Sequence, residues 1–406
     1  MSALIRRLLA PYRRAYRDLP ADVWRLALVS FVNRSGTMVV PFLVLYLTDR
    51  VDLGPAEAGR VLSLYGVGSI AGVGIGGWLT DRVGAVRVQT ASLVAGAVGL
   101  VVLGQLTSPL AISVAVLLFS TANEAFRPAS VAAIAEHAPP RVHARAFGLN
   151  RMAVNLGWTI GPALGGMLAV RDYAWLFRVD AASCLFAAAM LLPLRNRVGH
   201  PPEPEAEAAP ARSPWRDKPL VAAVVLTALS GIAFFQVHST FPLFLHDVRG
   251  FAEDKVGFLF AVNTVMIVLF EMVLLQKIEH ARPLRIVALG GLFIGLGFGL
   301  LPFGESVLWV AFTIAVWTVG EMLSAPMIMT FVSSRARAES RGKTMALLSS
   351  AFAVALVLAP IVGPSLYELV GPYAVWYLCA ALGFSVAVGF FVLERVVRRE
   401  GQRPIS

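Results

Sequence analysis

Residues 219–235 read PLVAAVVLTALSGIAFF, a run without a charged side chain that directly follows the charged segment RDK at 216–218. Blocks of the same kind occupy residues 88–104 and 344–363. A helix needs about 20 mostly apolar residues to cross the hydrocarbon core of a bilayer. These blocks therefore predict a chain that crosses a membrane several times.

The composition of the whole chain agrees with this interpretation. Of its 406 residues, 57% are hydrophobic and 15% are charged, and the mean hydropathy is +0.71. Soluble domains carry about 25% charged residues, so this composition excludes a water-soluble globular protein and predicts lipid as the main solvent. Alternating strand-length segments are not seen, which argues against a porin-like barrel.

The apolar blocks predict an all-α membrane protein with twelve transmembrane helices in two pseudo-symmetric six-helix bundles. Helices 5 and 8 of this set carry polar residues. The twelve predicted spans are 22–48, 56–80, 87–107, 110–135, 145–169, 173–194, 219–245, 254–278, 284–303, 306–332, 342–368 and 372–394.

Arginine and lysine are distributed unequally between alternate loops. One set of loops contains Arg50, Arg171, Arg249 and Lys255, whereas the other set and both termini contain most of the remaining basic residues. Because loops rich in arginine and lysine stay in the cytoplasm, we expect a multi-pass protein of the cell (inner) membrane with both termini cytoplasmic. The net charge of +10 then reflects membrane topology, and we expect no nucleic-acid partner.

The segment at 199–215 reads GHPPEPEAEAAPARSPW, which is too polar and proline-rich to form a core. Three pairs support two repeated halves, because Pro41 and Pro242, Gly161-Pro162 and Gly363-Pro364, and Pro128 and Pro326 are each about 200 residues apart. The predicted organisation is a cytoplasmic amphipathic segment at 1–21, bundles at 22–194 and 219–394, a cytoplasmic linker at 195–218 and a cytoplasmic tail at 395–406.

The loop after the second predicted helix reads GGWLTDRVGAVR at 76–87 and resembles the cytoplasmic loop signature of the major facilitator superfamily. Ala85 and Val86 depart from the family pattern, which usually has a basic residue directly after the second glycine. The residues that carry the resemblance, and that we expect to form a cytoplasmic gate, are Gly77, Asp81, Arg82, Gly84 and Arg87.

The resemblance implies two interpretations of Asp81. The first is a gate in which this carboxylate meets the N-terminus of helix 11 near Arg341–Thr344, where the helix dipole favours an anion. The second is an ordinary ion pair with the neighbouring Arg82. We favour the gate because the glycines and charges occur together in one loop.

The fifth predicted helix reads GWTIGPALGGML at 157–168 and looks like the signature of the family's drug:proton antiporters. The matching residues are Gly157, Gly161, Pro162, Gly165 and Gly166. Glycines also recur every fourth residue at 68, 72 and 76. Such ridges allow close helix contact, either as static packing or, as the family implies, as a sliding seam between halves.

Four ionisable residues at membrane depth are candidates for proton coupling, because such residues cost about 2.5–3.5 kcal/mol each at a helix centre. They are Arg34, Glu124, Arg127 and Glu321. Glu321 is the preferred proton carrier, since burial without a basic neighbour favours a protonated carboxyl. The competing interpretation is a structural charge cluster in which Arg34 or Arg127 neutralises Glu124.

Polar and aromatic residues on the predicted helices are candidates for substrate binding: Asn33, Asn123, Gln236, His238, Asn155, Trp158, Asn263 and Trp317. For each of them packing is an equally good explanation. Cys184 and Cys379 lie in separate apolar blocks, which predicts neither a disulfide nor a metal site. No phosphate-binding glycine loop is found, so the expected energy source is the proton motive force and no cofactor.

These features together predict a non-enzymatic, proton-coupled exporter (antiporter) of amphiphilic or drug-like small molecules that works by alternating access. The alternatives are a translocator of lipids or lysolipids, an importer of small metabolites, and a membrane sensor that transports nothing. The family resemblance implies a monomer in the lipid bilayer.

Overall fold

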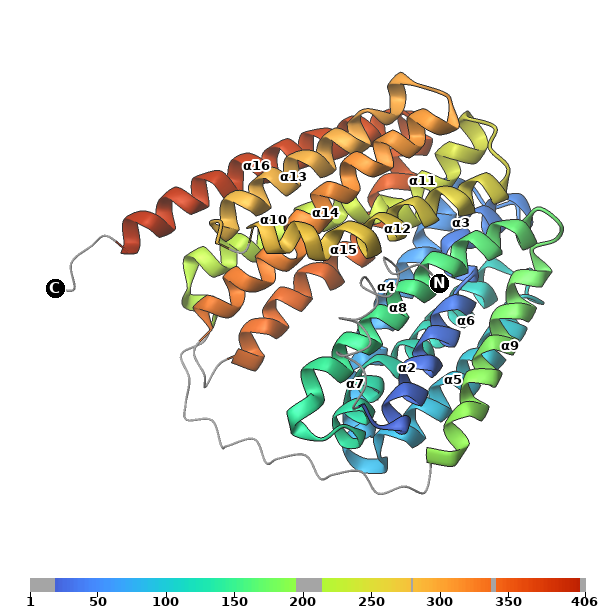
Figure 1. Cartoon of the computed structure of the whole chain (residues 1–406). Helices are drawn as coiled ribbons and strands as arrows, with labels where there is room; N and C mark the ends of the chain where they lie inside the picture. Colours follow the sequence, from blue (N-terminus) through green and yellow to red (C-terminus); the bar gives the residue numbers. More distant parts are fainter. Residues whose placement is uncertain (1–18, 195–213, 279, 337–340, 402–406) are drawn as a thin grey trace, which may run out of the picture. The chain divides into compact units, whose positions relative to one another are not determined.

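The computed structural model describes residues 19–194, 214–278, 280–336 and 341–401. In these ranges the chain is helical and contains no β-strand. Most of the predicted N-terminal segment, residues 195–213 of the predicted linker and the last residues of the tail lie outside the described ranges. Figure 1 shows the order of the elements along the chain.

The helices of the N-terminal part are α2 (Ala21–Gly36), α3 (Val39–Asp49), α4 (Pro55–Val83), α5 (Ala85–Leu103), α6 (Pro109–Glu124), α7 (Phe126–His137), α8 (His143–Ala169) and α9 (Ala174–Leu191). Those of the C-terminal part are α10 (Lys218–Phe234), η4 (Phe235–His238), α11 (Thr240–Leu243), the π-helical turn η5 (Phe244–Val248), α12 (Glu253–Ile278), α13 (Pro283–Gly299), α14 (Val307–Arg335), α15 (Arg341–Leu369) and α16 (Ala374–Gly401).

Each predicted span falls on a helix or on a short series of helices. Within the described residues, eleven helical segments are long and apolar enough to cross a membrane. The remaining predicted span corresponds to α8, whose sequence HARAFGLNRMAVNLGWTIGPALGGMLA mixes polar residues and glycines with its apolar residues. The polar character noted in the sequence therefore sets this helix apart from the other eleven.

Three of the predicted spans are interrupted, and each interruption precedes a proline. The first span changes from α2 to α3 before Pro41, the fourth from α6 to α7 before Pro128, and the seventh from α10 through η4 to α11 before Pro242. Proline has no N–H for the carbonyl four residues earlier, and its ring crowds that carbonyl. The repeated prolines at 41 and 242 therefore mark corresponding breaks in the first and seventh spans.

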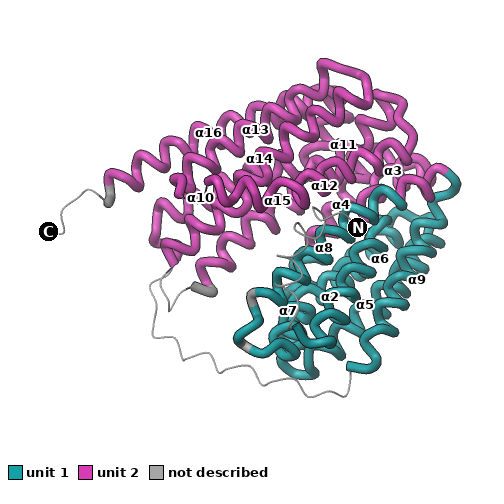
Figure 2. Tube along the Cα trace, in the orientation of Figure 1, with its two compact units in different colours: residues 1–39, 68–164, 171–204 teal, residues 40–67, 165–170, 205–406 magenta. Residues whose placement is uncertain are grey.

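The described residues divide into two compact units, coloured separately in Figure 2. Unit 1 takes residues 1–39, 68–164 and 171–204, and unit 2 takes 40–67, 165–170 and 205–406. The units do not follow the predicted halves of the sequence, because α3, the first part of α4 and the end of α8 pack with the C-terminal helices.

In unit 1, α5 packs against α6 and α9, and α2 packs against α9. In unit 2, α13 lies between α14 and α16, and α10 contacts α15 and α16 (Figure 1). Part of the unit 2 core is aromatic: the ring of Trp317 stacks on Phe298 with centroids 4.4 Å apart, and Phe241 meets Trp317 edge-on at 5.1 Å. This rigid aromatic packing lies beside the cavity described next.

Candidate functional site

Glu321 lies inside the continuous helix α14, where it faces an amide on α12. The side-chain nitrogen of Asn263 donates a hydrogen bond to Oε2 of Glu321 at 2.9 Å and to Oγ1 of Thr318 at 3.0 Å. Thr318 is one turn before Glu321 and donates its own hydroxyl to the backbone carbonyl of Ile314. The amide is thus held in place by two acceptors on one helix, and it presents an N–H to the carboxyl group.

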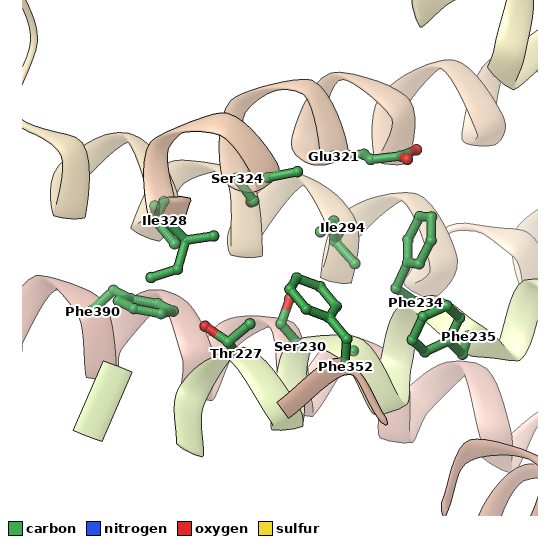
Figure 3. A pocket seen from close by; sticks show the side chains of 13 residues that line it. Thr227, Ser230, Phe234, Phe235, Ile294, Glu321, Ser324, Ile328, Phe352 and Phe390 are labelled. Atoms are coloured by element: carbon green, nitrogen blue, oxygen red, sulfur yellow. The ribbon is translucent and has the colours of Figure 1, made fainter. Parts of the chain in front are cut away.

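A cavity of about 120 Å³ opens beside Glu321 in unit 2. Figure 3 shows Glu321 and Ser324 on one wall and the rings of Phe234, Phe235 and Phe352 across from them. The lining is mostly apolar, and the other residues that contribute to it are Thr227, Ser230, Gly231, Val287, Ile294, Ala325, Ile328 and Phe390. A small guest with apolar surface and one polar or charged group would fit this chemistry.

The electrostatic surroundings of Glu321 contain no positive partner among the described residues. Its hydrogen-bond partner is a neutral amide, and the nearby charge that acts on it is a second carboxylate, Glu271 of α12. The hydroxyl of Ser324 is buried and finds no hydrogen-bond partner in the described part of the chain. The cavity therefore combines an unneutralised carboxyl group with an unused hydroxyl.

Glu124 in unit 1 has a different environment. It is the last residue of α6 and is buried, and Nη1 of Arg127 lies 3.5 Å from its Oε2. The Arg127 side chain is 62% exposed, against 8% for Glu124. The sequence predicted that these two residues share a helix face, and the structure brings them together across the junction between α6 and α7.

Arg34 is buried in α2 and acts electrostatically on Asp180 of α9. Oδ2 of Asp180 accepts hydrogen bonds from the backbone N–H groups of Met38 at 3.2 Å and Val39 at 3.4 Å. These are the first N–H groups of α3, and an anion is favourable at such a helix start.

Asp180 corrects the sequence interpretation, which placed it near the membrane surface in an ion pair with Arg178. The aspartate is 4% exposed, and the guanidinium of Arg178 lies over the ring of Trp175 instead, 5.4 Å from its centroid. A sequence signal existed in the form of an aspartate within an apolar block, but its partner is the helix break before Pro41, which lies far away in sequence.

Gln236, a predicted substrate contact, is used entirely for packing in this structure. It is 1% exposed. Its amide nitrogen donates to the carbonyls of Ala359 at 3.0 Å and Ile232 at 3.2 Å. Its amide oxygen accepts from the hydroxyls of Ser239 and Thr240. No hydrogen-bonding capacity is left for a substrate.

Trp317, predicted to line a cavity, is also in the core. It is 1% exposed and its ring stacks on Phe298. The structure therefore assigns Trp317 to the aromatic packing of unit 2. Asn263 is the polar candidate in unit 2 that reaches the carboxyl group of Glu321.

The other predicted substrate residues occupy separate places. In unit 1, Asn33 is buried and its amide nitrogen lies 3.8 Å from the sulfur of Cys184, while Asn123 is buried beside α5. Asn155 and Trp158 are partly buried on α8. In unit 2, the ring of His238 stacks on that of Phe260, with centroids 6.2 Å apart.

The predicted gate loop connects α4 and α5 through a tight turn. Gly84 has φ +92°, a conformation that residues with a side chain rarely adopt. Asp81, Arg82 and Arg87 are all exposed, and the guanidinium of Arg82 lies 4.1 Å from the ring centroid of Trp78. Nothing fills the space next to the Cα atom of Gly77. The proposed contact of Asp81 with helix 11 stays a prediction.

The glycine ridges contact neighbours within their own part of the sequence. A methyl group at Gly72 or Gly76 would clash with the backbone of Thr121 or Ala125, and one at Gly157 or Gly161 would crowd α2. These contacts are static packing. Of the other helix 5 motif residues, Gly166 lies against the backbone of Glu253 at the start of α12, Gly165 is buried, and Pro162 lies inside α8.

Contact between the first part of α4 and α15 uses a different pair of glycines, which the sequence analysis did not select. A methyl group at Gly59 would overlap the carbonyl oxygen of Pro360, and one at Gly66 would lie 3.0 Å from the carbonyl oxygen of Leu356. Pro360 and Pro364 deprive these two carbonyls, each four residues earlier, of their helical N–H donors. The glycines thus allow α4 to approach the carbonyls that the prolines leave unpaired.

The long apolar helices, the proline breaks and the carboxyl group buried beside a small cavity define a multi-pass membrane transporter. A family model described as Major Facilitator Superfamily matches residues 26–347. The chain belongs to this superfamily and is a transporter, not an enzyme.

Named relatives are similar over most of their length. A Na(+), Li(+), K(+)/H(+) antiporter of Planococcus maritimus is 24% identical over 373 residues, which covers 82% of this chain and 86% of the relative. Multidrug resistance protein MdtH of Aeromonas hydrophila is 23% identical over 370 residues, covering 89% and 92%.

Solved structures share the fold at low sequence identity. The crystal structure of peptide transporter POT in complex with sulfate superposes with a TM-score of 0.79 at 18% identity and covers 94% of this chain and 95% of that chain. Nucleoside transporter NupG gives a TM-score of 0.79 at 15% identity, with coverage of 91% and 99%. These similarities concern the fold alone.

Proposed function

We propose that the protein is a proton-coupled antiporter of the cell (inner) membrane that exports amphiphilic small molecules by alternating access. The observation that carries the proposal is the carboxyl group of Glu321, which faces a neutral amide beside a mostly apolar cavity. Burying a carboxylate without a cation is costly. A protonated carboxyl avoids this cost, so proton binding and release at Glu321 can drive a change of state.

The same proposal includes the finer architecture. Counting α8 as a membrane span gives twelve transmembrane helices in two six-helix bundles, with both termini in the cytoplasm and the protein acting as a monomer. The arginine-rich loops support this orientation. The glycine and proline content of α8 explains why its hydropathy is lower than that of the other spans.

Proton and substrate are proposed to use the unit 2 cavity. The rings of Phe234, Phe235 and Phe352 offer apolar contact, and aromatic faces also attract organic cations. The carboxyl group of Glu321 can hold either a proton or a cationic guest, and this competition is the physical basis of exchange. Proton motive force is then sufficient as the energy source.

A second candidate is exchange of monovalent metal cations for protons, which is the activity printed in the name of the Planococcus maritimus relative. The oxygens of Glu321 and Thr318 and the unpartnered hydroxyl of Ser324 could contact such an ion. Organic and inorganic cations therefore need to be tested side by side.

The test uses proteoliposomes with an acidic lumen and the cytoplasmic face of the protein outward. Addition of ethidium is expected to release protons from the lumen, which a trapped pH indicator reports, whereas NaCl and KCl serve as the inorganic arm. Glu321→Gln is expected to abolish the response. Glu305→Gln is the matched control, because the side chain of Glu305 is 88% exposed. Full proton release by the Glu321→Gln protein would exclude this carboxyl group from coupling.

A further inference from the structure

Charged residues gather at one end of unit 2, where segments from distant parts of the sequence meet. Asp49 at the end of α3, His246 in η5 and Glu253 at the start of α12 each place one side-chain oxygen or nitrogen within 4.8 Å of the others. The three residues are partly or fully exposed. This cluster, called the His246 cluster below, connects the first, seventh and eighth predicted spans.

Every charged group that faces His246 in this cluster is acidic. Nδ1 of His246 lies 3.1 Å from Oδ1 of Asp247, its neighbour in η5. Asp49 from α3 and Glu253 from α12 add their negative charges, and the hydroxyl of Tyr367 from α15 donates to Oδ2 of Asp247 at 3.4 Å. The hydrogen bond to Asp247, followed by the charges of Asp49, Asp247 and Glu253, raises the pKa of His246 above its ordinary value despite partial burial.

The cations closest in sequence are engaged elsewhere. Arg249 donates to the backbone carbonyls of Leu301 and Pro302 at 3.0 and 3.1 Å and pairs with Glu305. The amine of Lys255 lies over the ring of Phe251. A proton on His246 is therefore the positive charge positioned between the carboxylates of Asp49 and Glu253.

A second contact at this end joins α4 to α15. Oε2 of Glu368, near the end of α15, accepts the backbone N–H of Ala56 at 2.8 Å. Ala56 is in the first turn of α4, where the helix dipole favours an anion. Glu368 follows Tyr367, so the end of α15 contacts both the start of α4 and the carboxylate that binds His246.

We propose that the His246 cluster and the Glu368–α4 contact form a proton-sensitive latch, in which protonated His246 holds this end of unit 2 closed. In the proposed topology this end faces the outside, because the arginine-rich loop after α4 lies at the opposite end of that helix. The latch lies beyond the Glu321 site and controls access, whereas Glu321 carries the coupled proton.

The direction of the pH effect follows from the raised pKa of His246. A group whose pKa is higher in the closed state stabilises that state fully at low pH, and the stabilisation is lost as the pH rises through the raised value. An acidic exterior would then favour closure of the outer end after proton loading. The neutral imidazole loses its attraction to Asp49 and Glu253, and the outer end opens more often.

The test measures the distance across the latch without any substrate. Spin labels are attached at Arg60→Cys on α4 and Val370→Cys after α15, both exposed, in a protein with Cys184→Ala and Cys379→Ala. Pulsed electron paramagnetic resonance in nanodiscs is expected to show mainly short distances at about pH 5.5 and a loss of more than half of that population at about pH 8.5.

Two substitutions of the same residue separate charge from structure. His246→Gln is expected to give long distances at both pH values, and His246→Arg, which stays charged, short distances at both. His280→Gln, which alters an exposed histidine at the other end of α12, is the matched control and is expected to behave like the parent protein. Glu368→Gln is expected to reduce the short population at both pH values while the pH response remains.

A His246→Gln protein with the parent pH response would overturn the proposal. So would a short distance that required micromolar zinc at every pH and disappeared with a chelator, since His246 would then act as a metal ligand. Because the distances are recorded without substrate, either result leaves the role of Glu321 in transport to its own experiment.

Discussion

Two buried carboxyl groups, Glu124 in unit 1 and Glu321 in unit 2, occupy similar sequence contexts and different electrostatic environments. Each precedes a proline, Pro128 or Pro326, by four or five residues. Glu124 ends a helix and is paired with Arg127, whereas Glu321 lies within a continuous helix and is paired with a neutral amide. Position near a proline therefore does not decide the function of such a carboxyl group, but its partner does.

The difference suggests a division of labour. A carboxylate beside an arginine stays charged and contributes a fixed attraction, whereas a carboxyl group beside an amide can change its protonation state at lower cost. The exposed guanidinium of Arg127 further weakens its pairing with Glu124, because water screens the charge. Glu321 is thus the stronger candidate for coupling, and three substitutions test this comparison.

The largest effect is expected for Asn263→Leu. It removes the amide that donates to both Glu321 and Thr318, and a hydrogen bond to a charged group contributes about 1.5–3 kcal/mol. Proton-coupled transport in proteoliposomes should fall by about tenfold or more. Asn155→Leu, on α8 in unit 1, is the control and should retain most of the activity. Unchanged transport by Asn263→Leu would place coupling elsewhere.

A smaller effect is expected for the prolines. Pro326→Ala should raise the thermal unfolding temperature in detergent, because α14 is continuous and a new N–H can bind the carbonyl of Met322 directly. Pro128→Ala should change it less, since the backbone already leaves the α6 helix before Phe126. Equal shifts for the two variants would show that the helix break does not depend on the proline.

The smallest effect is expected for Arg127→Gln. The side chain is mostly exposed and the ion pair spans 3.5 Å, and exposed ion pairs contribute about 0–1 kcal/mol. Transport should stay within about fivefold of the parent protein. A complete loss, measured in the same proteoliposomes, would return Arg127 to the centre of the coupling mechanism and reverse the comparison.

Much of the fold could be predicted from apolar blocks and charged loops, because lipid imposes one requirement on every span. The blocks at 88–104 and 344–363 fall on α5 and α15. The breaks in the first and seventh spans could have been predicted too, since Pro41 and Pro242 each remove an N–H from the helix. The sequence analysis used these prolines only as markers of a repeat.

The site was less predictable because its contacts are between distant residues. Glu321 and Asn263 were both selected from sequence, but nothing in their spacing showed that they meet. Gln236 and Trp317 looked like cavity residues because they are polar or aromatic, whereas the structure uses one to bind Ala359 and the other to fill a core. Asp180 was misplaced because its partner is a helix break.

The contact of Gly59 with the carbonyl oxygen of Pro360 has a consequence for movement. The two surfaces that touch are bare backbone, so separating them exposes carbonyl groups that water can hydrate and little apolar area. Neither state of such a joint carries a large solvation penalty, and few side chains must find new rotamers. The helices can part and meet again many times per second at this point without becoming trapped in either arrangement.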